Sequence, residues 1–286
     1  MTWSDQLREL GEPLAHRLWK RVFKTIGQVR GPSGFWTPLG GQRVLVVAPH
    51  PDDEVLGCAG TIAKHLSQGD QVEILIVTDG RLSRARNLKP QHMAETREDE
   101  AKAASALLSG AKLHWLGLEE GDWKQERFER SLAQIMESYR PDYIYGPCWL
   151  DYHPEHCKVA QGLAQCLSSE TCVRIYTLHV PLNDLVNLRI DVEQQMPLIR
   201  KTFEVYATQT RSLMRGLRMR HYAGLLTGTS LATEEFIELS GRSYRALHAE
   251  TNVQAKVRGL RHRSFLDPLS YLRGRQSRQR TKNLIT

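Results

Sequence analysis

The chain has 286 residues, a formal net charge of +7 and a hydrophobic fraction of 41%, values expected of a globular protein with one large domain, with or without appendages. No apolar run approaches the roughly 18 residues needed to span a bilayer, and the N-terminus carries Asp5 and Glu9 in place of the apolar core of a secretory signal. Five cysteines without a C-x-x-C pair predict reduced thiols in a cytoplasmic protein.

Residues 1–42 form an N-terminal extension. From Leu7 to Ile26, aliphatic residues recur at steps of three and four, which predicts an amphipathic helix with basic residues between its apolar positions. Such a helix could pack against the domain, which is the commoner arrangement, or lie on an anionic membrane surface. Glycines and prolines between Gly31 and Gly41 then predict a linker.

The first predicted strand leads directly into a polar cluster. Val44–Val47 are an unbroken apolar run, as expected of a parallel strand covered on both faces, and His50, Asp52 and Asp53 follow it. In open α/β sheets, ligands bind at the carboxyl ends of the strands. An imidazole and a carboxylate are zinc-type donors, and a second carboxylate can accept a proton from metal-bound water. Alternatively, Asp52 or Asp53 only caps the next helix.

Strand-like and helix-like segments alternate from Arg43 onwards, which predicts a Rossmann-like, mostly parallel sheet flanked by helices. The turn after the first strand lacks G-x-G-x-x-G and is acidic, so a dinucleotide-binding loop is excluded. The basic loop 81–90 could contact an anionic part of a substrate or simply be solvated. The predicted strands after the first are 72–77, 112–118, 142–146 and 173–181, and the predicted helices are 54–67, 94–108, 125–139 and 191–209.

A second polar cluster, residues 151–156, follows the strand predicted at 142–146 and contains His153 and His156. A lone H-x-x-H is weak evidence, because most such pairs are polar surface. Two His/acid clusters that each follow a strand of one sheet are far less expected by chance. Together they offer three ligands and leave coordination positions for water, as in a catalytic metal site.

These two clusters resemble the motifs of the LmbE-like/PIG-L family of N-acetylglucosaminyl deacetylases. Residues 49–54 (P-H-P-D-D-E) are similar to the family's A-H-P-D-D-E, and residues 153–156 (H-P-E-H) to its H-P-D-H. The departures are Pro49 for alanine and Glu155 for aspartate, neither of them a metal ligand in the family. The resemblance spans roughly residues 43–240, and its further matches are Arg97 and Glu100 (R-x-x-E-A) and Lys201 with Tyr206–Gln209 (K…Y-x-S/T-Q).

The resemblance implies a zinc-dependent hydrolase that removes the acetyl group from an N-acetylated amino sugar, in a glycan, glycolipid precursor or glycoconjugate. It implies one Zn²⁺ per chain held by His50, Asp53 and His156. The implied general base is Asp52, and His153 is implied to stabilise the oxyanion. It also places Arg97 near the substrate, whereas the spacing of Arg97 and Glu100 alone is equally that of a surface ion pair. The rival expectations are another metal-dependent amide or ester hydrolase and a non-catalytic membrane-surface protein.

The positive charge is concentrated at the C-terminus. Residues 242–286 hold eleven Lys/Arg and two Asp/Glu, whereas the rest of the chain holds 28 basic and 30 acidic residues. This composition predicts a partly disordered tail after a deacetylase domain at 43–241. Nearby apolar residues favour peripheral contact with an anionic membrane, at its inner, cytoplasmic face, over nucleic acid, for which no binding module is visible.

Overall fold

The computed structural model describes residues 34–149, 151, 153–178, 185–226 and 231–249, with Leu14, Arg17, Leu18 and Arg21 from the N-terminal segment. Apart from these four residues, the expected amphipathic helix lies outside the described residues, as does most of the expected basic tail. Within the described ranges, each helix is too short or too polar to cross a bilayer.

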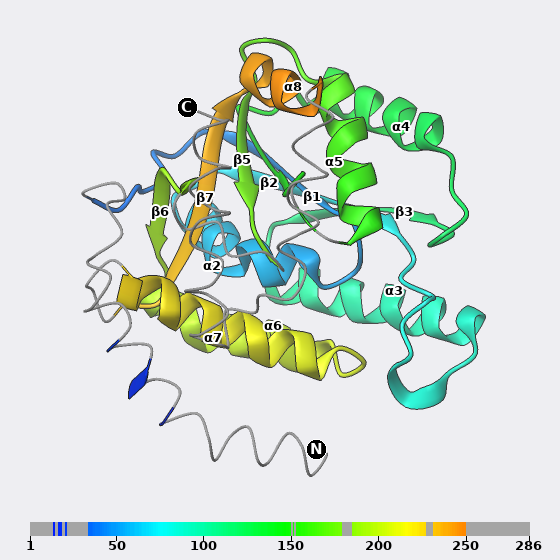
Figure 1. Ribbon diagram of the computed structural model, residues 1–286, viewed down its shortest axis with the longest axis horizontal. Coiled ribbons are helices and arrows are strands. Elements are labelled where there is room, and N and C mark those ends of the chain that lie inside the picture. Colours follow the sequence, from blue (N-terminus) through cyan, green and yellow to red (C-terminus); the bar gives the residue numbers. More distant parts are fainter. Residues whose placement is uncertain are drawn as a thin grey trace.

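The described strands form one seven-stranded sheet in the order β3-β2-β1-β4-β5-β7-β6 (Figure 1). Strands β1 to β5 pair in parallel, β7 runs antiparallel to β5, and β6 runs antiparallel to β7. The mostly parallel sheet predicted from the sequence is confirmed. The strands are β1 (Arg43–Ala48), β2 (Gln71–Thr78), β3 (Lys112–Leu118), β4 (Tyr143–Pro147), β5 (Cys172–Tyr176), β6 (Leu188–Asp191) and β7 (Thr233–Ser240).

Helices cover both faces of the sheet, so each face has its own apolar core (Figure 1). Along β1, Val44, Val46 and Ala48 face the core under α2, α3, α6 and α7. Leu45 and Val47 alternate with them and face the core under α4, α5 and α8. The helices are α2 (Asp53–Ser67), α3 (Pro90–Leu107), α4 (Gln125–Tyr139), α5 (Pro154–Cys166), α6 (Met196–Val205), α7 (Thr210–Leu226) and α8 (Gly241–Ala249), with short 3-10 turns at Ala85–Asn87 and Glu193–Gln195.

The order of the strands reverses at β1. After β1 the chain adds β2 and then β3 on one side, and β4 returns to pair with the other side of β1. Both β1 and β4 therefore end at the point where their connections diverge, which is where open α/β sheets bind ligands. Residues 49–54 follow β1 and residues 148–156 follow β4, so the topology brings the two predicted clusters together.

The C-terminal half differs from the prediction. The helix predicted at 191–209 is wrong at its start, because Leu188–Asp191 form strand β6 and the helix α6 spans only Met196–Val205. Neither β6 nor β7 was predicted. Both strands carry buried charges that are paired, such as Arg189 Nε with Glu235 Oε1 at 2.9 Å, and such charges make a buried strand look polar in the sequence.

Two further boundaries move. Strand β5 ends at Tyr176, and residues 179–181 of the strand predicted at 173–181 lie outside the described residues. The expected tail boundary at residue 242 falls inside α8, in which Tyr244 and Leu247 are buried against the α4/α5 side of the sheet. The packed part of the chain therefore reaches at least to Ala249, and residues 250–286 of the expected tail lie outside the described residues.

Candidate active site

The turn between β1 and α2 presents the first cluster. The carbonyl of Pro49 accepts hydrogen bonds from the backbone N–H and the hydroxyl of Thr78, at 2.9 and 2.7 Å, and these bonds fix the turn to the end of β2. Helix α2 begins at Asp53 and its N-terminal flanking residue is Asp52, whose side chain makes no capping hydrogen bond. Simple helix capping by Asp52 is therefore ruled out.

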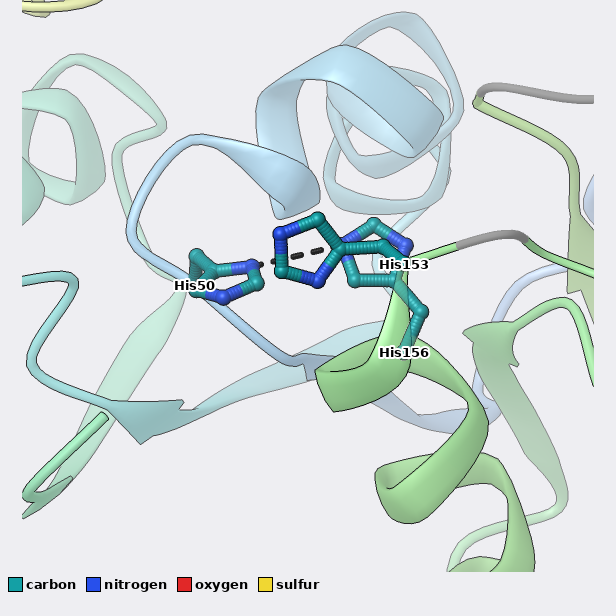
Figure 2. Close-up of side chains that lie close together, drawn as sticks. All are labelled: His50, His153 and His156. Atoms are coloured by element: carbon teal, nitrogen blue, oxygen red, sulfur yellow. Dashed lines mark hydrogen bonds between the residues drawn. The ribbon is translucent and has the colours of Figure 1, made fainter. Parts of the chain in front are cut away.

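Three donor atoms from the two clusters meet at the carboxyl ends of β1 and β4. The Nδ1 atom of His50 and the Nε2 atom of His156 each lie 3.1 Å from Oδ2 of Asp53, and the two nitrogens are 3.3 Å apart. Figure 2 shows the short His50–His156 contact, with His50 on the turn before α2 and His156 in the first turn of α5. All three side chains are buried.

This spacing fits a tetrahedral metal ion. Donors bound to zinc at about 2.0–2.1 Å in a tetrahedral site lie roughly 3.3 Å from one another, close to the three distances between the donor atoms here. Two imidazoles and one carboxylate are also a donor set that zinc accepts in catalytic sites. The residues present thus fit the zinc ion that the sequence implied.

His153 lies at the edge of the same cluster. Its ring stacks edge-on against that of His50, with the centroids 4.7 Å apart, and it is less buried than the other two histidines (Figure 2). Donor nitrogens of His50, His153 and His156 all lie within 4.8 Å of one another, so an all-histidine metal set is also geometrically conceivable. The set with Asp53 is tighter, and we favour it for that reason.

Two carboxylates lie at the other ring nitrogens of His156 and His50. Oδ2 of Asp151 lies 3.0 Å from Nδ1 of His156, which leaves Nε2 of that ring directed at Asp53. Oε1 of Glu120 lies 3.1 Å from Nε2 of His50. Such outer carboxylates orient imidazole ligands and raise their basicity. Sequence reasoning gave neither residue a role, since Glu120 comes from the loop after β3 and has no local signal.

The charges in this cluster shift one another. Burial lowers the pKa of His156, but Asp53 and Asp151 outweigh it and the pKa lies well above its usual range. Burial likewise raises the pKa of Asp53, yet the two histidines hold it well below the usual range. Asp53 is thus a carboxylate at neutral pH, the form that binds a metal ion.

Asp52 occupies the same turn but faces different partners. Its backbone has φ 121°, a strained conformation for a residue other than glycine. Nη2 of Arg97, on α3, lies 2.9 Å from its Oδ1 and also donates to the carbonyl of Pro51. Burial raises the pKa of Asp52 to about 7, although Arg97 opposes the shift. A carboxylate with a pKa near neutrality is suited to accept and return a proton.

The approach of Arg97 depends on a glycine. Gly80 follows β2 with φ +65°, and a Cβ atom there would lie 2.7 Å from both Nε and Nη1 of Arg97. The arginine therefore passes against bare backbone on its way to Asp52. Arg97 is 4% exposed and does not pair with Glu100, so the alternative of a surface ion pair is ruled out.

A third acid, Glu54, links the turn to a distant segment. Its Oε2 accepts the backbone N–H of Asp52 at 3.0 Å, and its Oε1 accepts the hydroxyl of Tyr206. Burial raises the pKa of Glu54 to about 7, and burial followed by the charge of Glu54 raises the pKa of Tyr206 well above its usual range. Tyr206 therefore keeps its proton and acts as a donor.

The segment after α6 also contacts α3. Oε1 and Oε2 of Glu100 accept the backbone N–H and the hydroxyl of Thr208, at 2.9 and 2.6 Å. Lys201, in contrast, is exposed on α6. The departure at Glu155 is directed away from the donor atoms, since its carboxylate accepts from Gly121 and from the indole of Trp123.

Comparison with known proteins finds a family for part of the chain. Residues 45–167 match the PIG-L family, described as GlcNAc-PI de-N-acetylase, so the resemblance expected from the two motifs is confirmed over this range. One similar protein is the diacetylchitobiose deacetylase of Thermococcus kodakarensis, 31% identical over 120 residues, which are 40% of this chain and 45% of that protein. The matched stretch thus spans less than half the length of this relative.

Two solved structures share the fold. The N,N'-diacetylchitobiose deacetylase of Pyrococcus horikoshii has a TM-score of 0.63 at 22% identity and covers 85% of this chain and 95% of its own. GalB of Pseudomonas putida, a 4-carboxy-2-hydroxymuconate hydratase, has a TM-score of 0.61 at 17% identity and covers 69% of this chain and 96% of its own. Because these two proteins carry out different reactions, the shared fold alone does not decide the chemistry.

Proposed function

We propose, from the premise that residues 45–167 are a PIG-L-type domain, that the chain is a zinc-dependent hydrolase that removes the acetyl group from an N-acetylated amino sugar of the N-acetylglucosamine type. One observation carries this proposal: His50, Asp53 and His156 present three donor atoms at zinc spacing, beside a carboxylate, Asp52, whose pKa burial raises to about 7. The activity named for the Thermococcus relative supports the choice of an acetylated sugar as substrate.

In this proposal, His50, Asp53 and His156 hold one Zn²⁺. A zinc ion supplies a Lewis acid that polarises the acetyl carbonyl and lowers the pKa of a coordinated water molecule. Asp151 and Glu120 keep the two imidazoles in the orientation that directs a nitrogen at the ion.

Asp52 acts first as general base and then as general acid. It accepts a proton from the attacking water and returns it to the amine as the C–N bond breaks, so that acetate and a free amino sugar leave. Arg97 binds one oxygen of this carboxylate, so in this proposal Arg97 orients Asp52 and does not itself contact the substrate, which revises the substrate-binding role expected for Arg97. His153, partly exposed at the edge of the cluster, is placed to stabilise the oxyanion.

The two neighbouring aspartates provide the sharpest test of these roles. Asp52→Asn should retain stoichiometric zinc and lose roughly 10²–10⁴-fold in kcat, because an amide cannot accept the proton. Asp53→Asn should lose zinc first, because a neutral amide is a poor ligand. Elemental analysis and acetate release from N,N'-diacetylchitobiose measure both effects. Zinc loss in Asp52→Asn together with full metallation in Asp53→Asn would mean that the two roles are exchanged.

A second candidate is a different metal-dependent reaction at the same three donor atoms, since a shared fold, such as that of the hydratase GalB, does not fix the reaction. Incubation of the zinc-loaded protein with N-acetylated sugars, the O-acetylated counterparts and an unsaturated carboxylate separates the alternatives. Release of acetate from the amide alone supports the proposed deacetylase. Turnover of the ester alone, or hydration alone, would replace it. No turnover of any of the three would favour the non-catalytic alternative.

We also retain the peripheral contact with an anionic membrane as a proposal. It rests on the composition of residues 250–286, which lie outside the described residues and hold nine of the eleven Lys/Arg of the expected tail. Each such charge near an anionic surface contributes about 1 kcal/mol and the contribution is screened by salt. Truncation after Ala249, which leaves α8 intact, should abolish salt-sensitive co-sedimentation with acidic vesicles. Unchanged sedimentation would exclude the tail as the contact.

A further inference from the structure

The turn that carries Asp52 is contacted by a part of the chain that lies beyond the residues matched to the PIG-L family. Residues 45–167 contain the donor atoms, Asp52 and Arg97, but Tyr206 and Thr208 lie about forty residues further along the chain. They follow α6, in the half of the molecule where β7 runs antiparallel to the rest of the sheet. Their contacts with the turn and with α3 therefore depend on the folding of the complete described chain.

The contact with the turn has two steps. The hydroxyl of Tyr206, which is 0% exposed, donates to Oε1 of Glu54. Oε2 of the same carboxylate accepts the backbone N–H of Asp52 at 3.0 Å. Glu54 thus spans the space between Tyr206 and the residue with φ 121°. A strained backbone persists only where its surroundings over-determine it, and this hydrogen bond acts directly on the strained residue.

A parallel contact ties the same segment to α3. Glu100 accepts both the backbone N–H and the hydroxyl of Thr208, and Arg97, three residues earlier on the same helix, holds the carboxylate of Asp52. Helix α3 therefore contacts the side chain of Asp52 through Arg97, and the segment 206–208 acts on its backbone through Glu54. Both sets of hydrogen bonds are buried, so water cannot readily replace them.

We propose that Tyr206 is a positioning residue for the proposed reaction: acting through Glu54, it holds the backbone of Asp52 in the conformation that aims its carboxylate at the metal-binding atoms. This inference rests on the proposed function for its kinetic consequence, but not for its structural one. Tyr206 touches neither the donor atoms nor, in this proposal, the substrate. Its removal should change turnover without changing the metal content.

Tyr206→Phe tests the proposal, with Tyr244→Phe as the matched control. Tyr244 is also 0% exposed, but its hydroxyl is 3.4–3.5 Å from the carbonyls of Ala160 and Pro147, on the other face of the sheet. Tyr206→Phe should lower kcat for acetate release about 10- to 100-fold, with KM changed less than about threefold and zinc content unchanged, since a small displacement of a catalytic group can cost about a hundredfold. Tyr244→Phe should leave all three near wild type.

A double-mutant cycle examines the route of the effect. Glu54→Gln replaces one of the two acceptor oxygens that Asp52 and Tyr206 use separately with an NH₂ group, so one of the two hydrogen bonds is lost in its present geometry and kcat should fall. Adding Tyr206→Phe to Glu54→Gln should then have little further effect, because the two residues act as one unit. Multiplicative losses in the double variant would show that Tyr206 does not act through Glu54.

Hydrogen exchange provides a readout that needs no activity. In Tyr206→Phe, the peptide that contains the amide of Asp52 should exchange about tenfold faster or more, and in Tyr244→Phe it should exchange as in the wild type. Unchanged exchange in Tyr206→Phe would overturn the positioning role whatever the kinetics. Faster exchange in a protein whose wild type releases no acetate would instead overturn the proposed function and leave the positioning role standing.

Discussion

Two histidines in this molecule have nearly the same hydrogen-bonding arrangement, but they lie at opposite ends of the strands. His156 lies at the carboxyl ends of the strands, and its Nδ1 is hydrogen-bonded to Oδ2 of Asp151. Oδ1 of that aspartate accepts a hydrogen bond from the backbone N–H of His153. His65 lies in the last turn of α2, at the amino ends of the strands, and its Nδ1 is hydrogen-bonded to Oδ2 of Asp70. Oδ1 of Asp70 likewise accepts a backbone N–H, from Gln42.

The difference lies at the other ring nitrogen. Nε2 of His65 lies 2.9 Å from the hydroxyl of Tyr145, which also accepts from Arg174. Nε2 of His156 instead faces Asp53 and His50. Burial lowers the pKa of His65, whereas the two acids around His156 outweigh burial and raise its pKa. An Asp–His pair is therefore structural when a hydroxyl completes it and a candidate metal site when other donors do.

Substituting alanine for each of the two histidines should give the largest difference between the two sites. His156→Ala removes one of three zinc donors, so we expect loss of stoichiometric zinc and a fall in acetate release of at least about a hundredfold. His65→Ala should keep zinc and lose about 2–5 kcal/mol of stability, because a buried carboxylate loses its partner. Elemental analysis and urea unfolding measure the two. Zinc retained by His156→Ala would remove this histidine from the ligand set.

The two aspartates should differ in the same way, with smaller effects. Asp151→Asn should weaken zinc affinity about 10- to 100-fold, because the amide no longer supports the ligand imidazole. Asp70→Asn should leave zinc affinity within about threefold of wild type and cost about 1–3 kcal/mol in stability. Competition with a zinc chelator measures the affinities. Equal affinities in the two variants would mean that Asp151 does not act on the metal site.

The pH dependence of His65 should give the smallest effect. Burial lowers the pKa of His65 in the folded state below its ordinary value of about 6.5, so the folded state binds fewer protons than the unfolded state at mildly acidic pH. The stability that neutral His65 contributes is present above pH 6.5 and falls as the pH drops below it. In zinc-loaded protein, the stability difference between wild type and His65→Phe should therefore narrow from pH 7.5 to pH 5.5. If the stability difference widened instead, the pKa of His65 in the folded state would be raised rather than lowered.

Much of the sheet and the cluster could be predicted because their signals are local. The apolar runs of β1 and β2 and the acids and histidines that follow β1 and β4 are continuous in the sequence. Glu120 could not be predicted as a partner of His50, since the two residues are 70 positions apart and only the fold joins them. Strand β7 was missed for a similar reason: its buried Glu234 is neutralised by Arg220 on α7.

The segment 206–209 was seen only as part of a family resemblance, and nothing in its spacing indicated that it contacts the turn. The contacts that hold Asp52 in place include its pairing with Arg97, 45 positions away, and the pairing of Glu54 with Tyr206, 152 positions away. Periodicity within one segment carries no information about such pairings. Sequence patterns therefore located the candidate ligands, whereas the residues that orient them came from the structure.

The close passage of Arg97 over Gly80 restricts how this protein can vary. Any side chain at position 80 would have to displace the guanidinium that holds Asp52, because even a methyl group would lie 2.7 Å from it. A saturation library at this position, selected for turnover, should therefore return glycine alone. Replacing Arg97 with a smaller residue would restore the space but not the ion pair, so the two positions can change only together and only at the expense of the reaction.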